Sequence, residues 1–247
     1  MINSVTAQII LSNAEVKRLL EDKSSDSRAE ISGRIASSYS NAVLDEKERQ
    51  IAEQIFRLLL RDTEIKVRAS LAENLKESNL VPRDIILSLA NDVNEVALPI
   101  LEYSHVLNDS DLLDIIHASQ ENLKYLAISR REEVSEVVSY TLVHKGDGWV
   151  VDSLLNNDGA AISENVFSKI IDEYKDHTEF MEAMTARKHL PISVVEKLMN
   201  VVSVGIADSL KQKYKLPDEA IQKEVEKNRE SETLNLVRSA HSHDDVG

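Results

Sequence analysis

The sequence predicts an all-α protein, an α-solenoid in which antiparallel helix hairpins stack on one another. Three observations predict this fold. Apolar residues recur at three- and four-residue steps along most of the chain, which is the period of an amphipathic helix. The 247 residues include only 6 Gly and 4 Pro, too few for the many turns of an all-β protein. Two stretches, "RDTEIKVRASLAENL" and "NDVNEVALPILEYS", share one pattern, which indicates a repeated unit.

Three helices are expected before the first repeat. Ser12 and Glu15 have the spacing of a capping box and predict the start of a short helix. The stretch "SSDSRAEISGRIASSYS" predicts a weaker helix that is broken at or near Gly33. Asp45 is expected to cap a strongly amphipathic helix. The residues that this helix is expected to bury are Ile51, Ile55, Leu58 and Leu59.

The two units are offset by 29 residues, so that Val96 in the second aligns with Val67 in the first. This offset is close to the length of a helix-pair repeat. The structural repeat positions are Asp62, Val67, Arg68 and Leu71 in the first unit and Asp92, Val96, Pro99 and Ile100 in the second. The second helices of the two units are expected to bury Ile85, Ile86 and Leu89, and Leu112, Leu113 and Ile116. Because proline lacks an amide hydrogen, we expect Pro99 to bend its helix rather than to take part in chemistry.

Later helices follow the same pattern. One is expected around "ENLKYLAIS", two more on either side of Gly146 and Gly148, and a pair in the region 160–189. Pro191 is expected in the first turn of a final regular helix that buries Ile192, Val195, Leu198, Met199 and Val202. The sequence therefore predicts a repeat domain over residues 1–205. Residues 206–247 are expected to form a peripheral charged helix, which begins at Pro217, and a disordered tail.

Charge and composition restrict the partners. The net charge is −14, and residues 61–200 hold 25 acidic and 14 basic side chains. Such a surface repels phosphate groups, which argues against binding to nucleic acids or anionic membranes and favours a basic protein partner. The chain has no Cys and opens without a basic, strongly apolar leader. We therefore expect a cytoplasmic protein.

No motif for catalysis or for cofactor binding is present in the sequence. It contains neither a G-x-S-x-G elbow nor a phosphate-binding glycine loop, so we expect no enzymatic activity and no cofactor. The best metal-like set is His105, Asp114 and His117. These residue types near helix ends more often act as caps or solvated surface groups, and we expect no metal site.

Six residues are candidate contacts for a partner protein. Tryptophan and arginine are frequent in binding hot spots, which favours Trp149, Arg130 and Arg131. Leu234, Leu236 and Val237 are apolar residues in an otherwise charged tail. Two alternatives remain open. Trp149 would fill the seam between two hairpins, or the arginines would neutralise nearby carboxylates or complete a ladder between repeats.

The region from Leu11 to about Val202 resembles a bacterial family called domain of unknown function 2336, whose members are similar to HEAT-type helical repeats. Segments that carry the resemblance include "EKERQIAEQIFRLLLRDTEIKVRASLAENL" and "ARKHLPISVVEKLM". The resemblance predicts a fold but gives no indication of an activity. HEAT-type repeats place an Asp in the turn and a V-[RK] pair afterwards, as at Asp62, Val67 and Arg68. In the second unit Ala97 follows Val96, so a ladder of Asp and Arg would be interrupted there.

Function can be predicted only as a class. Stacked hairpins form an extended surface, so we expect a non-enzymatic scaffold or adaptor that recognises another protein. The alternative is a ligand sensor or an enzyme that uses dispersed polar residues on the concave face of the array. Polar residues that converge on one pocket would favour this alternative.

Overall fold

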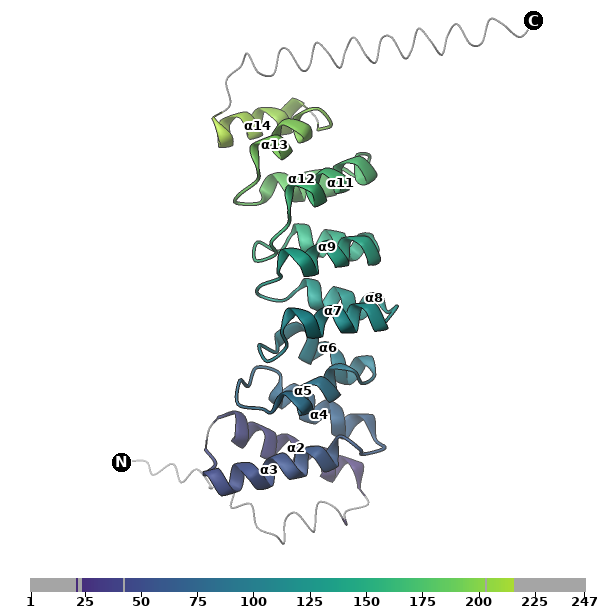
Figure 1. Cartoon of the computed structure of the whole chain (residues 1–247), viewed down its shortest axis with the longest axis vertical. Helices are drawn as coiled ribbons and strands as arrows, with labels where there is room; N and C mark the ends of the chain where they lie inside the picture. Colours follow the sequence, from purple (N-terminus) through teal and green to yellow (C-terminus); the bar gives the residue numbers. More distant parts are fainter. Residues whose placement is uncertain (1–20, 22–23, 42, 203, 216–247) are drawn as a thin grey trace, which may run out of the picture. The chain divides into compact units, whose positions relative to one another are not determined.

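A computed structural model of the chain describes residue 21 and residues 24–41, 43–202 and 204–215 (Figure 1). Within these ranges the secondary structure is helical, with one isolated β-bridge between Val134 and Ala160. The all-α prediction is therefore confirmed. The helices are α2 (Ser25–Ser40), α3 (Glu46–Leu59), α4 (Ile65–Leu75), α5 (Arg83–Ala90), α6 (Asn94–Tyr103), α7 (Asp109–Ala118), α8 (Asn122–Ser129), α9 (Glu136–Lys145), α10 (Gly148–Leu155), α11 (Glu164–Tyr174), α12 (Thr178–Ala186), α13 (Ile192–Met199) and α14 (Val204–Tyr214).

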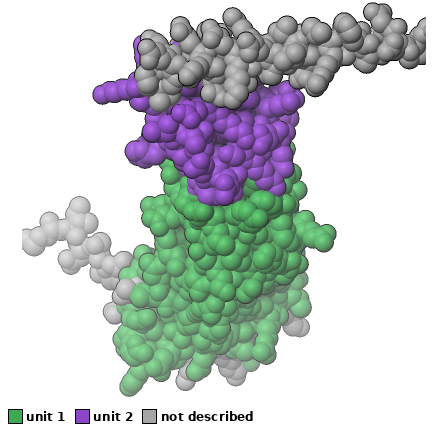
Figure 2. Space-filling model, turned by 45° about the horizontal axis from the view of Figure 1, so that its top comes forward, with its two compact units in different colours: residues 1–161 green, residues 162–247 purple. Residues whose placement is uncertain are grey.

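The chain divides into two compact units, residues 1–161 and 162–247 (Figure 2). The first unit contains α2 to α10, and the second contains α11 to α14. The boundary predicted at residue 205 thus falls inside the second unit, near the start of α14. The helix predicted after Pro217 and the capping box at Ser12 lie outside the described residues.

Helices of the first unit pack mainly against the helix two places further along the chain. The even-numbered helices α2, α4, α6, α8 and α10 follow one another in this way, and α7 packs on α9. Neighbouring helices such as α5 and α6, or α9 and α10, also contact each other. The even-numbered helices α2 to α10 therefore each bury one face against the next even-numbered helix (Figure 1).

The helical register of the repeats agrees with the sequence prediction. Val67, Leu71 and Leu75 on α4 are completely buried, and so are Val96 and Ile100 on α6. On the second helices, Ile85, Ile86, Leu89, Leu112 and Ile116 are also buried, whereas Leu113 is only half-buried. Because three- and four-residue spacing places these side chains on one face, they form the inner face of each helix.

Two details of the amino-terminal helices differ from the prediction. Asp45 caps α3 and forms a capping box with Glu48, as expected. The buried face of α3, however, consists of Ala52, Ile55, Phe56 and Leu59. Ile51 is half-buried and Leu58 is exposed. The bulky Phe56 ring fills the inward position, which turns Leu58 toward solvent.

Gly33 does not break its helix, because α2 runs without interruption from Ser25 to Ser40. The residue instead allows close packing against α4. A Cβ atom on Gly33 would lie 2.8 Å from Ser70 Oγ and 3.1 Å from Asn74 Nδ2. The Ser70 hydroxyl also donates a hydrogen bond to the Ala29 carbonyl, at 2.8 Å. The prediction of a break was wrong because this glycine provides space for a neighbouring helix rather than freedom for its own backbone.

The second unit shows the same skip-one packing, since α11 contacts α13 and α12 contacts α14. Pro191 is the residue just before α13, one position earlier than predicted. The helix buries Val194, Val195 and Leu198, while Ile192 is 62% exposed. Ile192 was predicted to be buried, but Val194 takes the inward position one half-turn later.

Lysine side chains connect helices within the second unit. Lys197 Nζ on α13 lies 2.7 Å from the Asp172 carboxylate and 3.0 Å from the Ser168 carbonyl, both on α11. Lys213 Nζ on α14 donates to the carbonyls of Thr185 and Arg187 at the end of α12, at 2.8 and 2.6 Å. The Lys213 contacts satisfy carbonyl groups that the end of α12 leaves without an intrahelical partner.

Candidate functional site

Trp149 and Arg130, two of the candidate contact residues, line one groove between α8 and α10. We call it the α8–α10 groove. Its volume is about 570 Å³, and its lining residues are Leu126, Arg130, Trp149, Asp152, Ser153, Asn156 and Asn157. Trp149, Asp152 and Ser153 belong to α10 and lie three and four residues apart, so they share one face of that helix. The groove therefore brings together residues from two helices that are adjacent in space but separated in sequence.

The start of α10 determines where Trp149 lies. The Asp147 carboxylate caps the helix by accepting hydrogen bonds from the amides of Trp149 and Val150, at 3.1 and 3.2 Å. Trp149 is thus in the first turn, where it is 77% exposed, while Val150 and Val151 are buried. The alternative in which Trp149 fills the seam between hairpins is wrong, because these two valines occupy the buried face.

Polar contacts hold the two sides of the α8–α10 groove together. Ser129 Oγ on α8 donates to Ser153 Oγ on α10, at 2.7 Å. Asn157 Nδ2, just after α10, donates to the carbonyls of Ser129 and Arg131, at 2.9 and 2.8 Å. The side chain of Asn157 therefore fixes the end of α10 beside the end of α8, where Arg130 begins the next loop.

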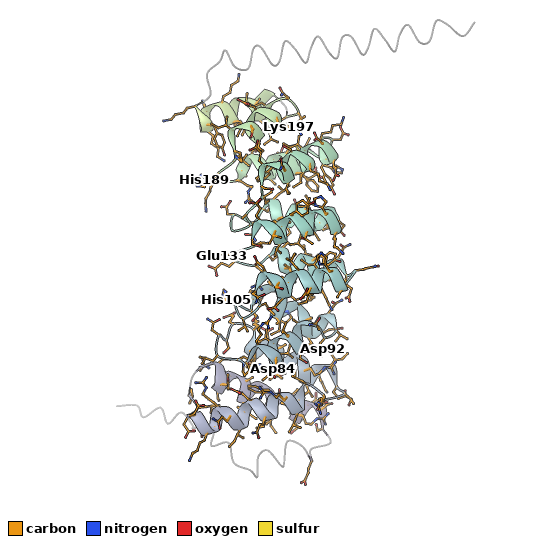
Figure 3. All side chains as sticks on the ribbon, viewed as in Figure 1. Asp84, Asp92, His105, Glu133, His189 and Lys197 are labelled. Carbon is orange, nitrogen blue, oxygen red and sulfur yellow. The ribbon has the colours of Figure 1, made fainter. Side chains whose placement is uncertain are left out.

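A larger cleft lies along the loops that connect the helix pairs of the first unit. We call it the acidic cleft. Its volume is about 1160 Å³, and its ionisable lining residues are Glu77, Glu102, Tyr103, His105, Asp109, Arg130, Arg131, Glu132 and Glu133. His105 and Glu133, both labelled in Figure 3, project from the same edge of the unit. Arg130 lines this cleft as well as the α8–α10 groove.

The acidic cleft contains five carboxylates. Glu77, Glu102, Asp109, Glu132 and Glu133 take part in no ion pair within the described part of the chain. The cleft also holds two arginines, so its carboxylates outnumber its guanidinium groups. A cation that entered the cleft would meet several unpaired anions at short range, and attraction between them would be favourable.

Arg131 has a structural role, because its side chain is buried and hydrogen-bonded within the protein. The residue is only 8% exposed, and its guanidinium donates to the carbonyls of Leu101 and Ser104, both at 2.7 Å. These carbonyls lie at the carboxyl end of α6, where intrahelical partners are missing. Burial lowers the pKa of the Arg131 guanidinium. The two adjacent arginines therefore have different environments: Arg130 is exposed, whereas Arg131 caps a helix.

Tyr103 provides an aromatic surface in the acidic cleft. Its ring is 43% exposed, and the Lys76 ammonium group lies 4.6 Å from the ring centroid. A hydrogen bond with Glu102 raises the pKa of the Tyr103 hydroxyl. The ring therefore already contacts one cationic side chain of the protein itself, and that side chain also forms an ion pair with Glu73.

Three of the structural repeat positions, Asp62, Arg68 and Asp92, take part in a ladder of ion pairs. Arg28 on α2 binds Asp62 in the turn before α4, with 2.7 Å between nitrogen and oxygen. Arg68 on α4 binds Asp92 before α6, at 2.6 Å. No guanidinium follows on α6, because Ala97 occupies the position after Val96, as expected. Lys124 of α8 reaches the same turn and donates to the Asp92 carbonyl, at 3.1 Å.

The first ladder lowers the pKa values of its carboxylates. The hydrogen bond from Arg28 lowers the pKa of Asp62. Burial opposes this effect at Asp92, but hydrogen bonds from Arg68 and from the Val93 amide outweigh it, and the pKa of Asp92 is also lowered. Both groups are therefore held in the charged form at neutral pH.

A second ladder was missed by the sequence interpretation. Arg57 on α3 binds Asp84 on α5, at 2.9 Å, and Arg83 on α5 binds Asp111 on α7. Asp84 and Asp92 in Figure 3 belong to the two different ladders. The signal was present, because the partners are 27 and 28 residues apart, close to the repeat period. Pro99, a repeat position that lacks an amide hydrogen, lies inside α6, and the helix continues past it to Tyr103.

The residues predicted as the best metal-like set are His105, Asp114 and His117. Among the residues that the structure describes, no group of three His, Cys, Asp or Glu side chains is placed to hold a metal ion. His105 lines the acidic cleft, whereas Asp114 and His117 belong to α7. Leu234, Leu236 and Val237 lie outside the described residues. In the described ranges, no helix combines the length and apolar character needed to cross a membrane.

The fold and the two surfaces define an all-helical protein with a surface groove that exposes a tryptophan. The chain belongs to the DUF2336 family, described as an uncharacterised protein conserved in bacteria, whose profile matches residues 96–246. No curated protein and no solved structure gives a significant match. The matched region includes α8, α10 and most of the acidic cleft, whereas the opening repeat at 61–75, which carried much of the resemblance, lies before it.

Proposed function

We propose that this protein is a non-enzymatic helical-repeat scaffold or adaptor that binds another protein. The observation that carries the proposal is the exposure of Trp149. This large apolar ring is 77% exposed in a groove formed by two helices. Tryptophan and arginine in a partly enclosed apolar site are the residues that most often dominate binding energy at protein interfaces. Arg130 lines the same groove and is exposed.

The proposed architecture is an α-solenoid similar to HEAT repeats. Three features of the first unit support it. Even-numbered helices pack in succession, the repeat positions recur after 29 residues, and two ladders of Arg and Asp join alternate helices. In such an array each pair of helices contacts only its neighbours, which produces an extended surface suited to a long partner segment.

The proposed partner is a protein with basic side chains, located with this chain in the cytoplasm. The acidic cleft supports this choice, because its unpaired carboxylates attract ammonium and guanidinium groups and repel the phosphates of nucleic acids and membranes. A chain without cysteine needs no oxidising compartment in order to fold, which agrees with a cytoplasmic location.

Site-specific photocrosslinking tests the proposal. A photoreactive phenylalanine analogue replaces Trp149 in the full chain, which is expressed in a bacterium that encodes a family member. We expect irradiation to give one or a few discrete covalent adducts with other proteins. The control places the analogue at Asp114, which is exposed on α7 and lines neither surface. Adducts equal at both positions, adducts with nucleic acid, or no protein adduct at position 149 would overturn the proposal.

A further inference from the structure

We infer that the α8–α10 groove and the acidic cleft hold one extended segment of the partner, with an apolar side chain against Trp149 and Lys or Arg side chains in the acidic cleft. The inference rests on the proposed function, because it needs a protein partner. It adds the binding surface, the conformation of the bound segment and the order of side chains along it.

The two surfaces are continuous at Arg130, which lines both. The α8–α10 groove follows α10 from Trp149 in its first turn to Asn156 just after its end. Asn157 then donates to the carbonyls of Ser129 and Arg131, so this end of the groove lies where the acidic cleft begins. A segment that leaves the groove past Asn156 therefore enters the cleft.

The dimensions set the spacing of side chains in the segment. Helix α10 has 8 residues and is about 12 Å long at about 1.5 Å per residue. An extended chain advances about 3.3 Å per residue. About four residues thus separate the apolar side chain at Trp149 from the first basic side chain in the acidic cleft.

The groove end of the surface favours an apolar side chain. Trp149 presents its ring on one wall, and Leu126 from α8 adds aliphatic surface on the other. Asp152 and Asn156 are tied to each other, since Asn156 Nδ2 donates to the Asp152 carbonyl and carboxylate at 2.9 and 3.1 Å. An aromatic or branched aliphatic side chain would cover the indole ring and remove its apolar surface from water.

The cleft end favours cations because its carboxylates outnumber its guanidinium groups. Glu132 and Glu133 on the loop after α8 lie among five carboxylates without an ion pair in the described residues. Arg130, at the junction, is placed to donate hydrogen bonds to a backbone carbonyl of the segment.

Selection of peptides on the full chain tests the inference. The probe is a phage-displayed library of random peptides about twelve residues long, selected at low ionic strength. We expect enriched peptides to carry an aromatic or branched aliphatic residue and, about four positions away, two or more Lys or Arg residues. Enrichment of acidic peptides, enrichment without this spacing, or no enrichment at all would overturn the inference.

The most enriched peptide is then labelled with a fluorophore, and its affinity is measured by anisotropy. We expect Trp149→Ala to raise Kd by about tenfold or more, as for a hot-spot residue. The double variant Glu132→Gln/Glu133→Gln should raise Kd by about threefold to thirtyfold and reduce its dependence on salt. The charge-matched control Glu95→Gln/Asp114→Asn changes exposed carboxylates outside both surfaces and should leave Kd within about twofold.

The results separate this inference from the proposed function. If Trp149→Ala weakens peptide binding while the Glu132→Gln/Glu133→Gln variant behaves like the control, the groove binds protein but the acidic cleft does not hold the basic side chains. That outcome overturns the inference and leaves the proposed function in place. If position 149 forms no protein adduct in the photocrosslinking experiment, the proposed function itself fails. A dimer of this chain at the groove, detected by its mass in solution, would also overturn the inference.

Discussion

Two adjacent arginines have opposite environments, although neither residue type nor charge distinguishes them. Arg130 is exposed between the α8–α10 groove and the acidic cleft. Arg131 points inward and satisfies the carbonyls of Leu101 and Ser104. The difference arises because α8 ends at Ser129, and the turn that follows directs successive side chains to different sides.

We expect Arg131→Met to lower the free energy of unfolding by about 1 to 3 kcal/mol, because two carbonyls at the end of α6 lose their donors. The matched variant Arg130→Met should change it by less than about 0.5 kcal/mol, since its side chain is exposed. Urea unfolding followed by circular dichroism measures both. Equal effects of the two variants would contradict the assignment of Arg131 as a cap.

Leu71 and Leu58 form a second contrasting pair. We expect Leu71→Ala to lower the free energy of unfolding by about 2 to 5 kcal/mol, because Leu71 is completely buried and its removal leaves a cavity. Leu58→Ala removes the same atoms from a side chain that is 48% exposed and should cost much less. Thermal unfolding of both variants compares them directly. A loss below about 0.5 kcal/mol for Leu71→Ala would show that the register of α4 is different.

The helices themselves show how much periodicity can predict. Helix α4 was predicted with its buried face, because Val67, Leu71 and Leu75 repeat at four-residue steps and no larger neighbour displaces them. Helix α3 was predicted with its cap but with part of its buried face wrong, since Phe56 competes for the inward position. The spacing of apolar residues identifies the buried face of a helix, whereas the sizes of neighbouring side chains determine which residues at the border of that face are buried.

The candidate site could be predicted only in part for a similar reason. Trp149 and Arg130 were selected by residue type, and the structure places them in one groove. The acidic cleft was not predicted, because Glu77, Glu102 and Glu133 come from different loops and no spacing in the sequence connects them. Their proximity depends on the packing of α4, α6 and α8 in succession.

The ladders connect alternate helices, and their charge states make stability depend on pH. The pKa values of Asp62 and Asp92 are lowered in the folded protein, so both carboxylates contribute stability above their ordinary unfolded pKa of about 4. That contribution is lost as the pH falls through the lower folded values. We expect the free energy of unfolding to fall below about pH 4, and to fall less in Asp62→Asn/Asp92→Asn.

Urea unfolding at a series of pH values measures this difference. Asp114→Asn is the control, because Asp114 is exposed on α7 and makes no ion pair with any described residue. If the double variant and the control lost stability equally between pH 5 and pH 3 (approximately the range in which Asp titrates), the ladder would not be the source of the effect.

At the scale of the whole molecule, the chain is divided into two compact units. We expect the fragment 1–161 to fold without residues 162–247, because α2 to α10 form a continuous set of mutually packed helices. Its circular dichroism should be dominated by helix, and its thermal unfolding should be cooperative. A fragment that aggregates, or that unfolds gradually without a transition, would show that the second unit is needed.

The skip-one pattern of contacts in the first unit also has a mechanical consequence. The Arg28–Asp62 and Arg57–Asp84 bridges each tie one helix to the next but one, so a load applied to the amino-terminal end acts on a pair of helices at a time. Each detached hairpin of 29 residues would release roughly 100 Å of contour length at about 3.4 Å per residue. We therefore expect the first unit to lengthen under tension by one hairpin at a time, and to shorten by the same increments when the tension is released.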